Sequence, residues 1–366
     1  MKVLELCLSN GVGGLELYAA KVIRQYSRNN DIQVYPVIRK STLLEKRLLE
    51  SGNSPRYLRV LNRHFPLLAA YKLARLMEKL DIDVMHMHWA RDLLLAVLAK
   101  LFCKRSIRLV YTRQMAISRD KHDRYHKFVY KYVDAFITIT ELLRQQAIKY
   151  LPIEPDKVRL LYYGVPSPDA DSVNNCKSFF EESGLNTKSF KIGLFGRIEQ
   201  GKGQHILLDA IGKLDKNGYD VQGLLIGHAM DKAYLDKLFN TAKANNITER
   251  FQYFGFHNNP GAIMGCFDVV VLSSFEETFG LVLVEAMRSG TSVIGTNAGG
   301  VPEIIEPGQT GLLFEPGDSQ GLADAIAYLI TNPEQHKKIT ESGKRQADKL
   351  FSEEQHFAEL KQILAG

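Results

Sequence analysis

The stretch FEETFGLVLVEAMRSG, residues 275–290, is the one around which the rest of this chain is organised. The apolar run 269–272 just before it is typical of a buried strand, and residues 281–287 have the pattern of a helix. We therefore expect Glu277 on a strand-to-helix loop and Glu285 inside the helix that follows.

The two glutamates stand eight residues apart, a rise of about 12 Å along a helix. A helix N-terminus offers unpaired backbone N–H groups and a positive dipole end, which suit an anion. The arrangement fits a sugar diphosphate, with one carboxylate on a sugar hydroxyl, the other on a ribose diol and phosphate between them. The competing interpretation is two solvated glutamates on an amphipathic helix, which is the more common meaning of such a spacing on its own.

Length and charge narrow the protein class. A chain of 366 residues with 45% hydrophobic and 24% charged residues indicates a globular protein of two domains. The net charge of +6 conceals a basic first half and an acidic second half. The basic residues gather at 56–63, 100–108 and 119–131, which favours an anionic partner such as a membrane surface, an acidic glycan or nucleic acid. The alternative is charge that serves only solubility.

The four cysteines are far apart, and none forms a C-x-x-C pair. Three of them lie in apolar runs, so we predict reduced core thiols in a cytosolic protein. The first residues, MKVLELCLSN, do not resemble a signal peptide, because Glu5 interrupts a short apolar run. No apolar run is long enough to predict a transmembrane helix.

Strand and helix patterns alternate along the chain, which predicts an α/β protein with parallel, doubly wound sheets. Strands are predicted at 3–9, 32–38, 83–88, 107–112, 135–140, 158–162, 190–195, 221–226, 251–254, 269–272 and 292–295. Helices are predicted at 15–26, 65–80, 93–102, 126–133, 141–150, 204–214, 233–244 and 281–287, and from 318 onward. Residues 165–175 are rich in Pro, Ser and Asn and are interpreted as a linker. We expect two Rossmann-like halves with a ligand cleft between them, at the carboxyl ends of the strands.

Two glycine-containing loops follow the first predicted strand of each half. The first, residues 10–16, lacks the G-x-G-x-x-G spacing of a dinucleotide site, so a tight turn and ligand contact are equally good interpretations. In the second, residues 195–203, Arg197 and Lys202 flank a turn at the mouth of a strand. An arginine fork with a lysine charge suits a diphosphate, although two solvated charges are the alternative.

Three further groups of residues carry weaker signals for a binding site. The segment 297–303, NAGGVPE, can present backbone N–H groups after a strand. His86 and His88 lie on one face of a predicted strand, but no third ligand stands at zinc spacing, so core or cleft-lining histidines are favoured over a metal site. Asp81 and Asp83 precede a strand, at the wrong end for a ligand site, and are interpreted as structural.

Taken together and in this order, these motifs resemble the family-4 retaining glycosyltransferases of the GT-B fold. The resemblance covers essentially the whole chain and rests on Gly13-Gly14-x-Glu16, Gly196-Arg197-Ile198 with Lys202-Gly203, Glu277-x7-Glu285 and Gly299-Gly300-Val-Pro-Glu303. It implies two Rossmann-like doubly wound domains facing a cleft: an acceptor domain at 1–165 and a nucleotide-sugar domain at 166–351. It also implies a C-terminal helix, 352–366, that crosses back to the N-terminal domain.

The resemblance also implies roles for individual residues. Arg197 and Lys202 would neutralise the donor diphosphate, Glu277 would contact the donor sugar, and these three would carry catalysis. The remaining implied donor-binding residues are Gly13, Gly14, Gly196, His228, Phe256, Thr278, Phe279, Gly280, Leu281 and Glu285, the last of these on the ribose. Glu16, His88, Arg113 and Gln114 are expected on the acceptor or cleft side. Members of the family need no metal, so no metal or other cofactor is expected.

The chain departs from the family pattern at three places. Arg113 or Gln114 stands where such enzymes often carry a cleft histidine, which puts in doubt a role for an imidazole near the anomeric carbon. The linker begins Tyr163-Gly164 rather than Asn-Gly. Gly227-His228 replaces a Gly-x-Gly loop, a change that affects the expected base or sugar preference.

The resemblance implies a retaining hexosyltransferase (EC 2.4) that moves a sugar from a nucleotide diphosphate sugar, with UDP-sugar favoured, to a glycan or glycolipid acceptor. Bacterial surface polysaccharide or lipopolysaccharide synthesis is the expected setting, in the cytoplasm, with peripheral attachment to an anionic membrane through the basic half. One alternative is a nucleotide-sugar hydrolase, epimerase or phosphorylase on the same fold. Another is a basic nucleic-acid-binding protein, although no reader motif is present. A nicotinamide oxidoreductase is disfavoured by the missing fingerprint.

Overall fold

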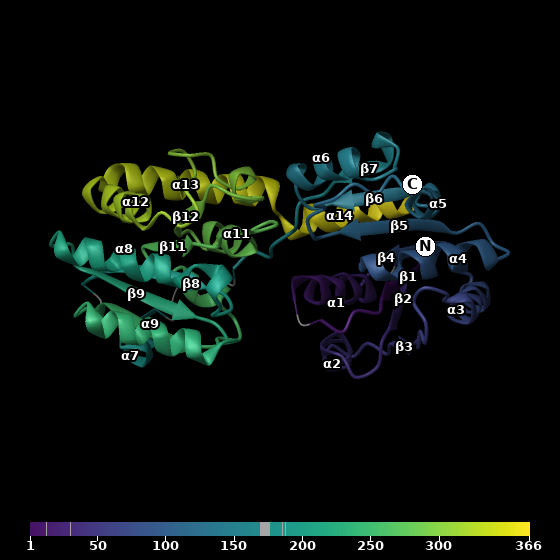
Figure 1. The fold of residues 1–366 in the computed structure, drawn as a ribbon, viewed down its shortest axis with the longest axis horizontal. Helices are drawn as coiled ribbons and strands as arrows, with labels where there is room; N and C mark the ends of the chain where they lie inside the picture. Colours follow the sequence, from purple (N-terminus) through teal and green to yellow (C-terminus); the bar gives the residue numbers. More distant parts are fainter. Residues whose placement is uncertain (12, 30, 169–175, 185, 187) are drawn as a thin grey trace. The chain divides into compact units, whose positions relative to one another are not determined.

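The protein consists of two compact units in a computed structural model that describes residues 1–366 except 12, 30, 169–175, 185 and 187. Unit 1 comprises 1–162 and 356–366, and unit 2 comprises 163–355. Unit 2 is therefore inserted into unit 1, which contains both chain ends (Figure 1). The predicted linker, 165–175, lies outside the described residues from 169 onward.

Unit 1 is built on a seven-stranded sheet in the order β3-β2-β1-β4-β5-β6-β7, and its strand pairs are parallel. Its central strands are apolar and buried because helices cover both faces of a parallel sheet. The strands are β1 (Lys2–Cys7), β2 (Gln33–Ile38), β3 (Arg56–Tyr57), β4 (Val84–Met87), β5 (Arg108–Arg113), β6 (Ala135–Thr138) and β7 (Val158–Leu160). Strand order reverses between β1 and β4, the neighbours at which the sheet is wound in both directions.

The helices of unit 1 include one from the end of the chain. Those from the first part are α1 (Gly14–Ser27), α2 (Leu43–Glu50), α3 (Leu67–Leu80), α4 (Leu93–Phe102), α5 (Arg124–Lys131) and α6 (Glu141–Tyr150). Helix α14 (Glu353–Ala365), yellow in Figure 1, lies among the blue and purple elements of unit 1. It buries His356, Phe357, Leu360 and Leu364. The C-terminal helix that returns to the N-terminal domain is therefore confirmed.

Unit 2 is built on a six-stranded parallel sheet in the order β10-β9-β8-β11-β12-β13. The strands are β8 (Phe190–Phe195), β9 (Val221–Ile226), β10 (Phe251–Gly255), β11 (Val269–Leu272), β12 (Ser292–Thr296) and β13 (Leu312–Phe314). The helices are α7 (Cys176–Ser183), α8 (Gln204–Lys216), α9 (Lys232–Ala244), α10 (Gly261–Met264), α11 (Leu281–Arg288), α12 (Ser319–Thr331) and α13 (Pro333–Leu350). One large apolar cluster joins the sheet to α8, α9, α12 and α13. The predicted α/β class with two doubly wound sheets is confirmed.

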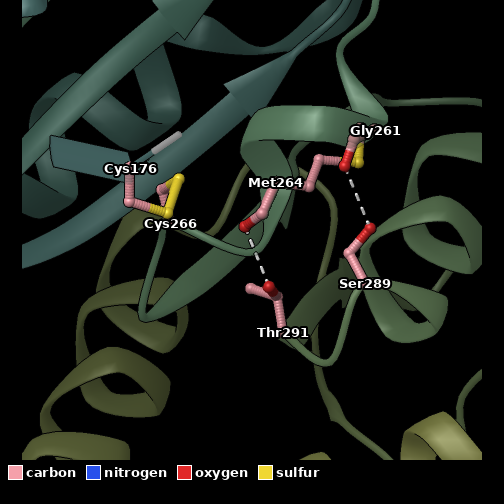
Figure 2. Close-up of a disulfide and its surroundings, with 6 residues drawn as sticks. All are labelled: Cys176, Gly261, Met264, Cys266, Ser289 and Thr291. Carbon is pink, nitrogen blue, oxygen red and sulfur yellow. Dashed lines mark hydrogen bonds between the residues drawn. A yellow bond between two sulfur atoms is a disulfide. The ribbon is translucent and has the colours of Figure 1, made fainter. Parts of the chain in front are cut away.

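The cysteine prediction is wrong for one pair, because Cys176 and Cys266 form a disulfide (Figure 2). The spacing gave no signal, since 90 positions separate the two residues, and the fold brings the first residue of α7 beside the turn after α10. Cys7 and Cys103 are unbonded thiols. Among the described residues, no helix combines the length and the apolar character that a membrane span requires.

Candidate active site

The sheet of unit 2 has its reversal of strand order between β8 and β11. In open parallel sheets, ligands bind beyond the carboxyl ends of the two strands at such a point. The loops there are 196–203 after β8 and 273–280 after β11, which contain Arg197, Lys202 and Glu277. The topology therefore places these predicted site residues where an α/β sheet ordinarily binds its ligand.

Lys202 and Glu277 meet across these two loops. The Lys202 ammonium lies 2.7 Å from Glu277 Oε2, and each side chain is roughly a quarter exposed. The Ser274 hydroxyl donates to the same carboxylate oxygen at 3.5 Å. Arg197 is half exposed and pairs with Glu199 at 2.9 Å. The sequence singled out Lys202 and Glu277 separately, and the fold joins them, leaving both reachable by a ligand.

The backbone of the lysine loop is fixed by the glutamate loop. The Ser273 hydroxyl donates to the carbonyl oxygens of Lys202, at 3.0 Å, and Gly203, at 2.9 Å. Gly203 has φ +68°, and a Cβ there would lie 2.0 Å from the Ser273 carbonyl oxygen. Glycine is therefore required at this close approach. Sequence reasoning missed Ser273 and Ser274, although two hydroxyls directly after a buried strand were a readable signal.

A third loop supports Glu277 from the far side. The Gly300 N–H donates to the Glu277 carbonyl oxygen at 2.9 Å. Gly299 has φ +60°, and a Cβ there would lie 1.9 Å from that oxygen. The segment 297–303, a weak signal in the sequence, thus holds the backbone of the glutamate loop in place.

Helix α11 begins directly after this loop. Gly280, at φ +103°, is its N-cap and its carbonyl accepts the Leu283 N–H at 2.9 Å, which leaves the Leu281 and Val282 N–H groups without a partner inside the helix. Phe279 is buried, and its ring meets Tyr163 and Phe351 edge-on at centroid distances of 5.3 and 5.7 Å. Burial of Phe279 fixes where α11 starts, so the positive end of this helix directly follows the loop that carries Glu277. Thr278 is half-buried between them.

Glu285, inside α11 as predicted, lines a cavity of about 210 Å³. The cavity is also lined by residues 165–168, residues 259–262 and Ser289. Buried Arg288 holds the first of these segments, since its guanidinium donates to the Val165 carbonyl and, at 2.7 Å, to the Ser167 hydroxyl.

The second wall of this cavity is fastened to α11 and β12. Ser289 donates to the Gly261 carbonyl at 3.3 Å, and Thr291 donates to the Met264 carbonyl at 2.8 Å (Figure 2). The disulfide through Cys266 adjoins the same segment. The cavity wall beside Glu285 is thus covalently linked to α7. Sequence reasoning missed Arg288, which follows Glu285 by three residues and carried no signal of its own.

The remaining donor-side predictions lie on neighbouring loops of unit 2. Gly196 directly follows β8 and has φ +149°. The His228 carbonyl, after β9, accepts the Ile198 N–H at 2.9 Å. Phe256, after β10, is 62% exposed. An exposed aromatic ring on a strand-end loop is available to stack on a planar group.

In unit 1 the glycine loop is held by Glu16. Its carboxylate is buried and accepts the Gly13 N–H at 2.9 Å and the Ser9 hydroxyl. Gly13 is the N-cap of α1 and Gly14 its first residue. Glu16 therefore shapes the loop as the N3 residue of a capping box, with both carboxylate oxygens engaged within the loop.

A buried carboxylate joins the two histidines of β4. Glu5 on β1 accepts from His86 Nδ1 at 3.1 Å and from His88 Nε2 at 2.7 Å, and His86 Nε2 contacts the Thr112 hydroxyl at 2.7 Å. Burial raises the pKa of Glu5, but the charge and N–H groups of His86 and His88 outweigh it and bring that pKa to about 2. Burial lowers the pKa of His88.

These three residues are the group of described side chains whose ligand atoms lie close enough to hold a metal, within 4.8 Å of one another. The Glu5–His88 and Glu5–His86 distances are those of hydrogen bonds to one carboxylate. His88 Nδ1 is buried without a partner in the described part of the chain. Sequence reasoning saw the histidines and missed Glu5 as their partner, although a lone glutamate in an apolar strand was the available signal.

The two other unit 1 predictions lie at the end of β5, Arg113 as its last residue and Gln114 directly after it. Arg113 donates to backbone carbonyls of its own loop, and Gln114 is buried with both amide atoms unpartnered among the described residues. The structure thus brings His88, Arg113 and Gln114 to the carboxyl ends of the adjacent strands β4 and β5.

Comparison with known proteins agrees with this arrangement. Residues 12–167 match the model of glycosyltransferase family 4, and residues 176–346 match that of glycosyl transferases group 1. The chain is 25% identical to the N-acetyl-alpha-D-glucosaminyl L-malate synthase of Bacillus anthracis, covering 82% of this chain and 78% of that protein. It is 26% identical to the capsular polysaccharide biosynthesis glycosyltransferase CapM of Staphylococcus aureus, covering 74% and 73%.

Two solved structures have a similar fold over nearly the whole chain. Alr3699/HepE of Anabaena, solved in complex with UDP, has a TM-score of 0.86 at 22% identity and covers 100% of both chains. The lipopolysaccharide outer core galactosyltransferase WaaB has a TM-score of 0.73 at 18% identity and covers 99% of both chains.

The two parallel sheets and the strand-end loops define a GT-B glycosyltransferase, an enzyme of the EC 2.4 class. The chain belongs to glycosyltransferase family 4, with the group 1 domain in its second half. The resemblance seen in the sequence is confirmed.

Proposed function

We propose that this enzyme transfers a sugar, with retention at the anomeric carbon, from a UDP-sugar to a glycan or glycolipid acceptor in bacterial surface polysaccharide or lipopolysaccharide synthesis. The observation that carries the proposal is the partly exposed Lys202–Glu277 pair at the β8/β11 reversal, beside the N-terminus of α11. HepE was solved with UDP, and CapM acts in capsular polysaccharide biosynthesis, which supports the donor and the setting.

The pair also supplies a physical account of donor binding. Lys202 and Arg197 each hold a carboxylate in the structure, and a diphosphate brings stronger acceptors for both cations. Glu277, released from Lys202, then accepts from hydroxyls of the donor sugar. Glu285 in the adjoining cavity accepts from the ribose diol, and the first turn of α11 contributes N–H groups to phosphate.

Other residues take supporting roles in this proposal. Gly13 and Gly14 allow close approach of the unit 1 loop to the donor, while Glu16 shapes that loop. His228 and Phe256 adjoin the base. His88, Arg113 and Gln114 serve the acceptor side. The full set is thus the one the sequence indicated, with Glu16 acting through the loop it caps rather than through direct contact.

The chemical step we propose needs no protein nucleophile. Lys202, Arg197 and the α11 dipole stabilise the negative charge that develops on the departing UDP. The acceptor hydroxyl attacks from the same face, and the departing phosphate oxygen takes its proton, so that one C–O bond breaks as another forms. We propose that this proceeds without a metal ion, which predicts full activity in excess EDTA.

Thermal shift against UDP-, GDP- and ADP-sugars tests the donor site. We expect a selective UDP-sugar shift in the wild type that is lost in Glu285→Ala and Arg197→Ala. A bound ligand raises stability by RT ln(1 + [L]/Kd), so the shift also ranks the donors. Glu334→Ala and Arg345→Ala, on α13, are matched controls and should respond as the wild type does. Equal shifts in all four variants would contradict the proposed site.

Product analysis tests retention at the anomeric carbon and distinguishes sugar transfer from hydrolysis of the nucleotide sugar. Proton NMR of the product linkage from an α-linked donor should show an α-anomer, and a β-anomer would contradict retention. Free sugar released as fast without an acceptor as with one would instead identify a nucleotide-sugar hydrolase on the same fold.

We further propose that unit 1 attaches to an anionic membrane surface. An apolar patch, in which every side chain is more than half exposed, lies on the loop before α3 and on its first turns. The patch comprises Leu61, Phe65, Leu67, Leu68 and Tyr71. Exposed Arg59 and Lys72 adjoin these residues in the sequence. Apolar side chains flanked by cations are the composition of an interfacial anchor.

Arg63 differs from its basic neighbours because it is used internally. It pairs with buried Asp92 at 3.1 Å, and its guanidinium lies 4.3 Å from the Trp89 ring centroid. Charge removal at Arg63 would therefore disturb the fold, and the membrane test should leave it unchanged.

Co-sedimentation with vesicles tests this attachment. We expect wild type to bind phosphatidylglycerol vesicles and not phosphatidylcholine vesicles, with binding lost in Leu61→Ser/Phe65→Ser. The control Tyr328→Ser/Leu350→Ser removes two exposed apolar side chains from unit 2 and should leave binding unchanged. Loss of binding to the same extent in both double variants would contradict the patch.

The cytoplasmic location stays a prediction.

A further inference from the structure

The loop between β5 and α5 gathers three cations. Arg113 is the last residue of β5, and Arg119 and Lys121 follow it before α5 begins at Arg124. Burial lowers the pKa of Lys121, and the nearby charges of Arg113 and Arg119 lower it further. The Lys121 ammonium therefore lies within electrostatic range of both the Arg113 and the Arg119 guanidinium. Within the described parts of the chain, none of the three forms an ion pair.

The carboxylates of this loop are engaged elsewhere. Asp120 pairs with His122 at 3.0 Å and accepts the His122 N–H. Asp123 pairs with His126 and caps α5 by accepting the His126 N–H at 3.1 Å. Neither carboxylate therefore forms a described ion pair with Arg113, Arg119 or Lys121.

Arg113 is also held in a fixed position. Its Nε donates to the Met115 carbonyl at 2.7 Å, one terminal nitrogen donates to the Ala116 carbonyl at 2.9 Å, and the other donates to the Tyr111 hydroxyl at 3.2 Å. A guanidinium has five N–H groups, so two remain for a ligand. Neutral carbonyl partners orient the group without cancelling its charge.

A second, independent observation comes from the next residue. Gln114 is 7% exposed, and neither its amide nitrogen nor its amide oxygen has a partner in the described part of the chain. A buried carboxamide without hydrogen bonds is costly and is rarely left so in a complete structure. It stands just beyond the carboxyl end of β5, where ligands of a parallel sheet bind.

We propose that Arg113, Arg119 and Lys121 bind the phosphate of a phosphorylated acceptor, and that Gln114 takes a hydroxyl or ester oxygen of the same molecule. The inference rests on the proposed transferase function and deepens it by naming the acceptor class. Three cations match a phosphomonoester dianion or a diphosphate better than they match a neutral glycan, and a fixed guanidinium suits phosphate oxygens.

Calorimetric titration tests the site without knowledge of the natural acceptor. The probes are inorganic phosphate and glucose 1-phosphate, with glucose as the neutral counterpart. We expect saturable binding of both phosphates to the wild type and none of glucose. Lys121→Gln and Arg119→Gln should each weaken binding about tenfold, the loss expected for one charge-assisted hydrogen bond. Lys131→Gln, at the far end of α5, is the matched control and should change binding less than twofold. Equal weakening in the control, or no saturable binding by the wild type, would overturn the proposal.

Two further measurements complete the test. Vesicle binding identifies the source of the phosphate, and UDP binding distinguishes failure of the acceptor site from failure of the proposed transferase function. Vesicles of phosphatidylcholine with and without phosphatidic acid test whether the phosphate is that of a lipid phosphomonoester. The readout is the extra binding that phosphatidic acid gives the wild type and that Lys121→Gln loses. Binding of soluble or lipid phosphate supports the site, and binding of neither overturns it. UDP binding is measured on the same samples. If the protein binds UDP but no phosphate, the acceptor-site proposal is contradicted and the proposed transferase function is not. If it binds phosphate in a Lys121-dependent way but does not bind UDP, the proposed donor function is contradicted and the acceptor site is not.

Discussion

At the scale of single residues, Glu277 is held by the surrounding structure through both its side chain and its backbone. Its carboxylate meets Lys202 at 2.7 Å, and its carbonyl accepts the Gly300 N–H at 2.9 Å. We predict that Glu277→Gln lowers the transfer rate from the preferred UDP-sugar by about 100-fold, the loss typical when one charged stabilising group is removed. The rate of UDP release with acceptor present is the measurement.

The neighbouring Glu276 provides the matched control, since it is exposed and no ion pair to it is described. Glu276→Gln should retain activity within about twofold, while both variants keep the melting temperature of the wild type within a few degrees. Similar losses in the two variants would show that loop charge alone matters, and would remove the specific role proposed for Glu277.

Gly299 tests the close packing behind this loop. Gly299→Ala adds a Cβ 1.9 Å from the Glu277 carbonyl oxygen in a left-handed backbone, and we expect a loss of at least about 3 kcal/mol in the free energy of unfolding. Gly308 is also left-handed, at φ +76°, but has open space around it. Gly308→Ala should cost only about 1 kcal/mol. Denaturant titration measures both, and equal costs would contradict the packing argument.

The individual site residues could be predicted because glycine and charge recur where strands end. Lys202 and Glu277 were each visible in this way. Their contact was not, because 75 positions separate them and only the β8–β11 pairing brings their loops together. The hydrogen bonds from Arg113 to the Met115 and Ala116 carbonyls could not be predicted from the sequence either, because they depend on how the loop folds back rather than on residue type.

At the scale of elements, α14 is joined to the rest of unit 1 by a titratable side chain. His356 Nδ1 donates to the Tyr162 carbonyl at 2.6 Å, and its Nε2 accepts from the Tyr18 hydroxyl at 3.0 Å. Burial lowers the pKa of His356 to about 4, and the charges of Lys21 and His86 act in the same direction. The folded protein therefore favours the neutral ring.

This pKa shift predicts acid destabilisation of unit 1. Between pH 6.5 and about 4 the unfolded chain binds a proton at His356 that the folded chain does not, so stability falls as pH falls through this window. The loss reaches about 3 kcal/mol at its lower end. We expect hydrogen exchange in α14 to accelerate from pH 7.5 to 5 after correction for intrinsic rates, and His356→Gln to remove most of the difference. An unchanged pH response in that variant would contradict the assignment.

The Cys176–Cys266 disulfide makes a second prediction for elements, in unit 2. Closing a loop of this length restricts the unfolded chain, so Cys266→Ser should lower the free energy of unfolding by about 2–4 kcal/mol. Denaturant titration with and without dithiothreitol measures the effect. The reductant should destabilise the wild type and leave Cys266→Ser unchanged, while Cys103→Ser, which removes an unbonded thiol, should behave as the wild type does.

Long apolar strands were the elements most accessible from sequence. The runs at β8, β9 and β11 were predicted with the bounds observed, because strands buried on both faces are predominantly apolar. Both residues of β3 are exposed, and α2 buries only Leu44 and Leu48, so neither element had a pattern long enough to detect. The region from 318 onward was helical as predicted, but its breaks at α12, α13 and α14 were not.

At the scale of the whole molecule, the division into two units predicts separable behaviour. A chain ending at residue 355 loses the His356, Phe357 and Leu360 side chains that unit 1 buries, whereas unit 2 keeps all of its residues. We expect unit 1 to lose its cooperative melting transition in calorimetry, while UDP still raises the transition of unit 2. Loss of UDP binding in the shortened chain would show that the donor site depends on unit 1.

The insertion of unit 2 within unit 1 has a consequence for how the protein is made. A ribosome synthesises the chain from its first residue onward, so the seven strands of unit 1 emerge early. They stay without residues 356–366, the last part of their unit, until unit 2 has been synthesised. Residues 163–355 of unit 2 are all synthesised before residues 356–366 of unit 1. Until residues 356–366 emerge from the ribosome, the apolar surface of unit 1 that they cover stays open to chaperones and to neighbouring nascent chains. The domain translated first is thus the one whose folding finishes last.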